Sequence, residues 1–140
     1  FISLVYGIVD LKKRTFHFAL AGHNPILRIT SDNGKVQKMQ PSGIGIGLAK
    51  GERFEDHIEE VEVTLAENDL LVLYTDGIVE ALNERETFYG EQRLNNLLKR
   101  SKRKSSKDIL ETLSQDVKSF VGKAKQHDDM TMLVMKLAKH

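Results

Sequence analysis

The sequence LLVLYTDG at residues 70–77 decides the fold of this chain, because an apolar run ends there in an acidic residue. The run from Leu70 to Tyr74 is continuous, which is typical of a strand buried on both faces of a sheet. Asp76 and Gly77 follow, so a carboxylate on a tight turn is expected where the strand ends. The stretch therefore predicts a central strand with an acidic side chain at its carboxyl end.

A second acidic pair, Asp128-Asp129, directly precedes the largely apolar stretch 131–137, which predicts the last strand. If the two strands are antiparallel neighbours, the end of one lies beside the start of the other, and Asp76 meets Asp128 at one sheet edge. Such carboxylates suit hard divalent cations such as Mg²⁺ or Mn²⁺. Asp-Gly turns and paired aspartates at a bend give the same pattern, so these residues alone leave a purely structural interpretation open.

Upstream of residue 70 the chain shows short β-strand patterns separated by turn residues. The expected strands are residues 2–8, 15–20, 26–29, 36–39 and 60–65. The first two form a hairpin, and Asp32-Asn33-Gly34 is a turn signal before the fourth. Residues 41–51 are rich in glycine and predict a loop.

Downstream of residue 77 the apolar residues recur at helical spacing. A short helix is expected after Gly90, and a second helix at about 106–121. Ser105 with Asp108 is typical of a helix start, and Gly122 of a helix end.

The last strand is apolar on both faces, so we expect it at the centre of the sheet beside residues 70–74. Strands that precede helices, without regular alternation, indicate an α+β layered domain.

The composition excludes several classes of partner. The chain has 140 residues, 21 of them basic and 20 acidic, so no strong field attracts nucleic acid or a membrane. The basic run from Lys99 to Lys104 is either a solvated linker between helices or a contact for an acidic partner. Cysteine is absent, which fits a cytoplasmic protein. No apolar run approaches the roughly 20 residues that span a bilayer, so no membrane contact is expected from this segment.

Several segments, taken together, resemble the SpoIIE/RsbU-like bacterial branch of the PPM-type (PP2C-like) serine/threonine phosphatases. YTDGIVEA at 74–81 resembles the YTDGxxEA signature, and DDMT at 128–131 resembles the DDxT motif. Further matches are AGHNP at 21–25, the glycine-rich residues 43–48, and FYGEQRL at 88–94, which resembles FGxxRL with Tyr89 inserted. The resemblance covers nearly the whole chain and implies a layered α/β/β/α sandwich.

The resemblance also implies a function and a site. Asp76 and Asp128 match metal ligands of a two-metal Mg²⁺ or Mn²⁺ site, and Asp129 is a further candidate that otherwise forms a turn or supports the ligands. Gly77 would shape the loop that aims Asp76. The implied reaction is hydrolysis of phosphoserine or phosphothreonine on a regulatory protein, such as an anti-sigma-factor antagonist, with no catalytic residue beyond the metal ligands. Histidine is a common general acid, so His23 invites that assignment, but a structural role in its loop is expected.

The family domain begins upstream of Phe1, so residues 1–140 are expected to be the C-terminal part of one such domain. The Gly-Asp and further Asp-Gly motifs that supply the bridging carboxylate are not in this sequence. We therefore expect an incomplete sandwich, a partial metal site and an isolated chain without turnover. An uncovered sheet would favour self-association. The alternative is a phosphatase-like module that binds a protein without catalysis.

Overall fold

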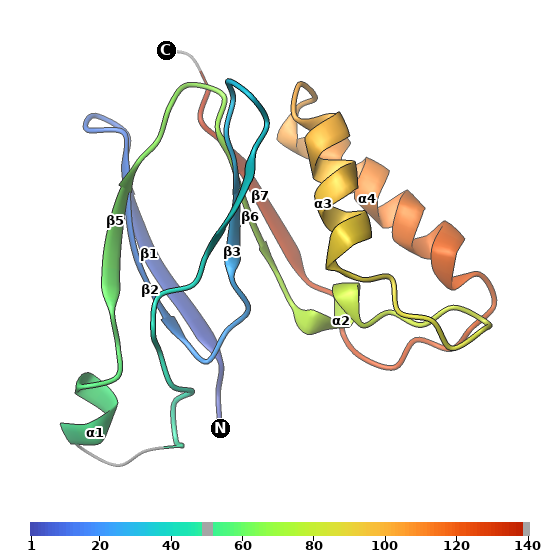
Figure 1. Cartoon of the computed structure of the whole chain (residues 1–140), viewed down its shortest axis with the longest axis horizontal. Coiled ribbons are helices and arrows are strands. Elements are labelled where there is room, and N and C mark those ends of the chain that lie inside the picture. The colour runs from blue at the N-terminus through green and yellow to red at the C-terminus, as the bar shows by residue number, and fades with distance from the viewer. Residues whose placement is uncertain (49–51, 139–140) are drawn as a thin grey trace.

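The computed structural model describes residues 1–48 and 52–138. In this part of the chain, two antiparallel sheets pack face to face (Figure 1). The first sheet has the order β1-β2-β5, with β1 at Leu4–Asp10, β2 at Thr15–Ala21 and β5 at Glu60–Thr64. The second has the order β4-β3-β6-β7, with β4 at Val36–Met39, β3 at Ile26–Ile29, β6 at Leu70–Tyr74 and β7 at Met132–Lys136.

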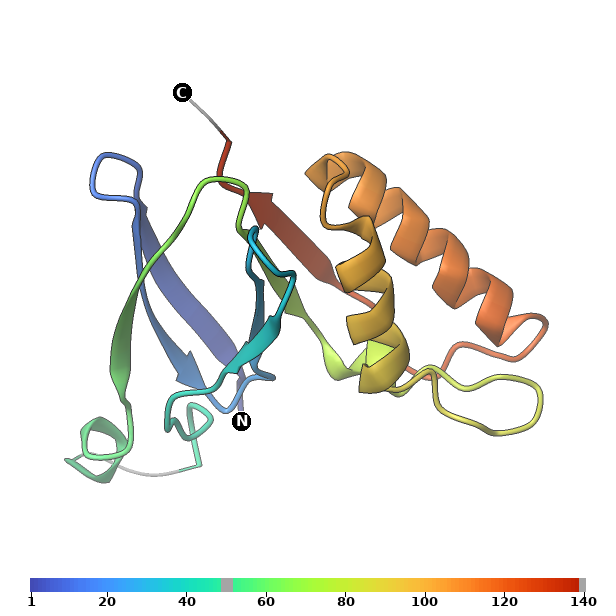
Figure 2. The same ribbon diagram turned by 45° about the horizontal axis from the view of Figure 1, so that its top comes forward.

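The helices are α1 at Glu52–Glu55, α2 at Asp76–Val79, α3 at Glu91–Ser101 and α4 at Ser106–Val121. The two long helices, α3 and α4, lie over the face of the second sheet that points away from the first (Figures 1 and 2). None of the helices in the described residues has the length and apolar character to span a membrane. The expected α+β class is confirmed, and three of the four expected layers are present in the described residues.

The predicted strands and the two predicted helices are all present, within about two residues of the expected ends. Ser105 caps α4 as expected, because its hydroxyl accepts a hydrogen bond from Asp108 N at 3.1 Å. Gly122 ends the helix with a φ of 61°. The one-turn helices α1 and α2 were not predicted, since four residues carry too little periodicity to reveal a helix. The end of the predicted glycine-rich loop, residues 49–51, lies outside the described residues.

Successive side chains of β6 point to opposite faces of the sheet and contribute to both hydrophobic cores of the molecule. Leu70, Val72 and Tyr74 pack toward α3 and α4, while Leu71 packs toward the first sheet. There it meets an aromatic pair on β2, Phe16 and Phe18, whose ring centroids lie 4.8 Å apart. The prediction that β6 is buried on both faces is confirmed.

The prediction for the last strand was correct about its neighbour and wrong about its central position. β7 pairs antiparallel with β6, with Leu70 opposite Lys136 and Tyr74 opposite Met132. It does not lie at the centre of the sheet. β6 lies between β3 and β7, so β7 forms one edge of the sheet in the described residues. Of its apolar side chains, Val134 is buried, Met132 and Met135 are partly buried, and Leu133 is half exposed.

The outer face of the first sheet carries exposed apolar side chains. Leu4, Tyr6 and Ile8 of β1 all point to this face, and Tyr6 is 65% exposed. Among the described residues, no long helix covers it, as both views show (Figures 1 and 2).

Candidate functional site

The pairing of β6 with β7 brings the two acidic segments together, as the sequence predicted. Thr75 joins them directly, because its N–H donates to Thr131 O at 3.1 Å. Its hydroxyl donates to Asp129 O at 3.0 Å and accepts from Thr131 N at 2.9 Å. This threonine was missed in the sequence. A single indication of its role was present in the sequence, a hydroxyl side chain between the end of β6 and Asp76.

Gly77 permits a closer approach of the same two segments. A Cβ atom at this position would lie 2.4 Å from Asp129 O and 3.5 Å from Asp128 Cβ. The expectation that Gly77 provides a tight turn is therefore refined: it lies in the first turn of α2, and its missing side chain makes room for the Asp128-Asp129 backbone.

The carboxylates of Asp76 and Asp128 are exposed at this junction. Oδ1 of Asp76 accepts from Gly77 N at 3.0 Å, and Oδ1 of Asp128 accepts from Asp129 N at 2.7 Å. In the described residues neither Oδ2 atom has a hydrogen-bond partner. Each side chain thus keeps one oxygen available to a ligand.

These two carboxylates fit part of a site for a hard cation. Mg²⁺ and Mn²⁺ prefer oxygen ligands and retain several waters, so two exposed carboxylates on neighbouring loops are a suitable donor set. In residues 1–48 and 52–138, no group of three or more acidic or histidine side chains is placed to hold a metal ion. The described residues therefore offer a share of the ligands for such a cation, and further oxygen donors are needed to complete its shell.

Asp129, His23 and Glu80 lie in surroundings that differ from those of Asp76 and Asp128. Asp129 accepts through its main-chain carbonyl from Thr75, and no contact of its carboxylate is recorded among the described residues. His23 Nδ1 lies 3.1 Å from Asn24 O, a local contact that agrees with a loop role. Glu80, the acidic residue of the YTDGIVEA segment, follows α2 directly and has an exposed side chain.

The glycine-rich loops lie at the same end of the sandwich as Asp76. Leu27 pairs with Val72, so residues before β3 lie where β6 ends. Gly22 N donates to Gly43 O at 3.2 Å, and a Cβ on Gly22 would lie 2.7 Å from Gly45 N. Two motifs far apart in the sequence are thus packed backbone to backbone at this end.

An aromatic cluster holds Tyr89 and the start of α3 against α4. The Tyr89 hydroxyl donates to Asp116 Oδ2 at 2.6 Å, and the Arg93 guanidinium lies 4.4 Å from the Phe120 ring centroid. Burial, with the Asp116 hydrogen bond second, raises the pKa of Tyr89. Burial likewise raises the pKa of Tyr74 to about 12, with a smaller contribution from Glu91. Both phenols stay protonated at neutral pH, and the Tyr89 hydroxyl acts as a structural donor to Asp116.

The register of the helix-entry motif needs correction. Tyr89 is only 3% exposed, whereas Phe88 is 59% exposed. The buried aromatic directly before Gly90 is therefore Tyr89, so Tyr89 is not an insertion and Phe88 is the additional residue. Adjacent aromatics cannot be ranked for burial from the sequence, because burial depends on the partners that α4 supplies.

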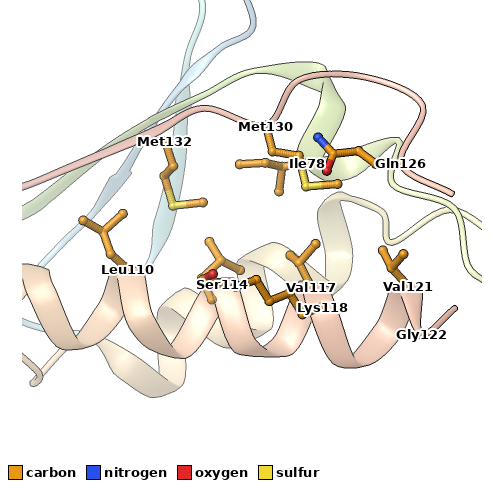
Figure 3. Close-up of a pocket in the computed structure, with 11 residues that line it drawn as sticks. Ile78, Leu110, Ser114, Val117, Lys118, Val121, Gly122, Gln126, Met130 and Met132 are labelled. Carbon is orange, nitrogen blue, oxygen red and sulfur yellow. The ribbon is translucent and has the colours of Figure 1, made fainter. Parts of the chain in front are cut away.

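A groove of about 550 Å³ runs between α4 and the segment that leads into β7. Met130, Met132 and Ile78 line one side, facing Val117 and Leu110 of α4 (Figure 3). Its lining is largely apolar, so it offers packing surface and few groups for chemistry.

We expect Gly77→Ala to disturb the junction between the two acidic segments. The added methyl group would overlap Asp129 O, so the free energy of unfolding should fall by about 1–3 kcal/mol in urea titrations of the chain. The amide resonances of residues 128–131 should shift. Gly90→Ala is the control: it strains a backbone with φ of 80° but meets no atom closer than 4.0 Å, so those resonances should not move. Unchanged resonances in Gly77→Ala would contradict the proposed close approach.

Comparison with known proteins identifies a family for this chain. Residues 1–138 match the family described as Stage II sporulation protein E (SpoIIE). The chain is 26% identical over 135 residues to Protein IcfG of Synechocystis sp., covering 96% of this chain and 20% of IcfG. It is 22% identical over 139 residues to the phosphoserine phosphatase RsbU of Bacillus subtilis, covering 97% of this chain and 39% of RsbU.

The fold also matches a solved structure, the phosphatase domain of SpoIIE from Bacillus subtilis. The TM-score is 0.72 at 24% identity, over 99% of this chain and 57% of that one. The chain thus spans less than two thirds of the length of each of these proteins. The family match covers nearly every residue of this chain, and the acidic junction lies within it. This chain belongs to the SpoIIE family of PP2C-like bacterial serine phosphatase domains.

Proposed function

We propose that the protein carrying this chain hydrolyses phosphoserine or phosphothreonine on a regulatory protein, using Mg²⁺ or Mn²⁺. The observation that carries this proposal is the junction of Asp76 and Asp128, held by Thr75 and Gly77, in a chain of the SpoIIE family. Among its relatives, RsbU is a phosphoserine phosphatase, the SpoIIE domain was presoaked with Mn, and RsbX was solved in complex with magnesium.

In this proposal Asp76 and Asp128 hold the metal, and no other residue of the chain acts on the reacting atoms. When bound, the metal activates water and neutralises charge on the phosphoryl group. Thr75 keeps the two acidic segments in register, and Gly77 keeps them close. Asp129 supports the junction through its carbonyl and remains a further candidate ligand.

We further propose that residues 1–140 form the C-terminal part of one phosphatase domain. The remaining metal ligands would then come from outside this sequence. The exposed apolar side chains of β1, Tyr6 among them, would be covered by the rest of the domain or, in the isolated chain, by self-association. The protein would act in the cytoplasm, and an anti-sigma-factor antagonist is the proposed class of substrate.

The test is phosphate release from a synthetic phosphoserine peptide by the full-length protein. We expect release with Mn²⁺ or Mg²⁺, none after chelation, and recovery when the metal is restored, because metal supplies the activated water. The isolated 140-residue chain should show no turnover under the same conditions. Absence of metal-dependent release by the full-length protein would refute the enzyme and favour the protein-binding module. Robust hydrolysis by the isolated chain would refute the partial site.

A further inference from the structure

A small pocket adjoins the acidic junction on the side of α4. It measures about 130 Å³, and its wall includes Gly77 and Asp128. Asp76 is not part of its lining. The pocket therefore lies next to the proposed metal site and shares one candidate ligand with it, but it does not contain the pair of carboxylates.

Lys125 and Phe88 are among the side chains of this pocket that have no evident role in the fold. Lys125 makes no hydrogen bond or ion pair within residues 1–48 and 52–138. Phe88 is the exposed aromatic that the helix-entry motif does not require. An unpaired ammonium and an exposed ring, placed together beside a candidate active site, form a surface suited to a polypeptide with both an anionic and an apolar group.

The loop that carries Lys125 is anchored on both sides of it. Lys123 N donates to Glu84 Oε1 at 3.0 Å, and Gln126 Nε2 donates to Asp128 O at 2.7 Å. The second bond is local and folds the loop onto the main chain of Asp128, a proposed metal ligand. Lys125 is thus presented at a defined position relative to Asp128, which is what a specificity residue needs.

We propose that this pocket binds the segment of the protein substrate that flanks the phosphoserine, with Lys125 pairing with an acidic side chain of that segment. The inference rests on the proposed function. The phosphate itself would lie at the metal that Asp76 and Asp128 are proposed to hold. Because Asp76 is absent from the pocket, Lys125 would contact a neighbouring residue of the substrate. Glu80 also lines the pocket, so a single carboxylate directed at Lys125 fits better than a uniformly acidic surface.

The test uses alanine-based peptides with one phosphoserine and one glutamate or lysine at each of three positions on either side. The full-length protein should bind and hydrolyse the best glutamate peptide about fivefold better than its lysine counterpart, the range of an exposed ion pair. Lys125→Glu should abolish or invert this preference. Hydrolysis of p-nitrophenyl phosphate, which has no flanking residues, should stay within about twofold.

The matched control is Lys123→Glu, the same change in charge two residues away on a side chain that does not line the pocket. It should leave the peptide preference intact. An equal effect of both variants would overturn the inference, since it would reflect general electrostatics. A matching loss on p-nitrophenyl phosphate would also overturn it, because Lys125 would then contact the phosphate.

Binding of fluorescein-labelled peptides, followed by anisotropy, separates this inference from the proposed function. Absence of hydrolysis of every substrate with Mn²⁺ refutes the phosphatase. If the peptides bind with a preference for glutamate and Lys125→Glu leaves that preference unchanged, the proposed role of the pocket is refuted and the phosphatase proposal is not.

Discussion

Asp76→Asn and Asp128→Asn should each lower Mn²⁺-dependent hydrolysis of a phosphoserine peptide by the full-length protein by more than about 100-fold. Replacing residues that only support metal ligands typically costs 10–100-fold, so loss of a ligand should cost more. An amide keeps the size of the side chain but carries no charge to attract the cation. Both side chains are exposed at the junction, so the variants should fold normally. The measurement is initial rate of phosphate release over a series of Mn²⁺ concentrations.

Two further variants test whether the loss of activity is specific to the proposed metal ligands. Glu111→Gln removes an exposed carboxylate on α4, outside the junction, and should leave the rate unchanged. Asp129→Asn should cost less than either ligand variant if its main role is the carbonyl bond to Thr75, because that bond survives the substitution. Unchanged activity in Asp76→Asn or Asp128→Asn would contradict the metal-ligand assignment. It would not affect the assignment of the chain to its family.

Asp69→Ala should destabilise the chain by about 3–5 kcal/mol, the range for breaking a buried ion pair. Asp69 is 2% exposed and precedes β6 directly. Its carboxylate accepts from Arg28 Nε at 3.0 Å and Nη2 at 2.6 Å, from Ser31 N at 2.8 Å and from Ala66 N at 3.0 Å. Truncation leaves the guanidinium and two main-chain donors without their acceptor.

The measurement for Asp69→Ala is the free energy of unfolding from urea titration. The control is Lys38→Ala, which breaks the pair between Lys38 and Glu91. Both of those side chains are nearly half exposed, so that loss should stay below about 1 kcal/mol. A similar, small effect of both variants would mean that the Asp69 cluster does not hold the turn before β6.

Local sequence patterns were sufficient for the strands, for the two long helices and for the meeting of the two acidic segments. The apolar run from Leu70 to Tyr74 predicted a strand buried on both faces, because each face of β6 meets its own core. Ser105 and Gly122 predicted the ends of α4, since capping depends on a few neighbouring residues. The prediction that Asp76 and Asp128 meet required only that β6 and β7 be antiparallel neighbours, and they are.

Other features depend on contacts that no local pattern contains. The edge position of β7 follows from pairing β3 with β6, whereas its apolar composition suggested a central strand. The burial of Tyr89 in place of Phe88 follows from Asp116 and Phe120, which α4 brings from farther along the chain. The pocket with Lys125 forms only where the loop after α4 passes α2 and Phe88.

The junction at Asp76 combines both kinds of information. The sequence alone was enough to propose the metal ligands, two carboxylates at strand ends in segments that resemble phosphatase motifs. How these two segments are held together became visible only in the folded structure. The hydroxyl of Thr75 reaches Asp129 across 54 residues of sequence, and Gly77 leaves space for the same carbonyl. The physical reason is that strand propensity and charge belong to a segment, whereas a close backbone approach belongs to a pair of segments and exists only once the sheet has formed.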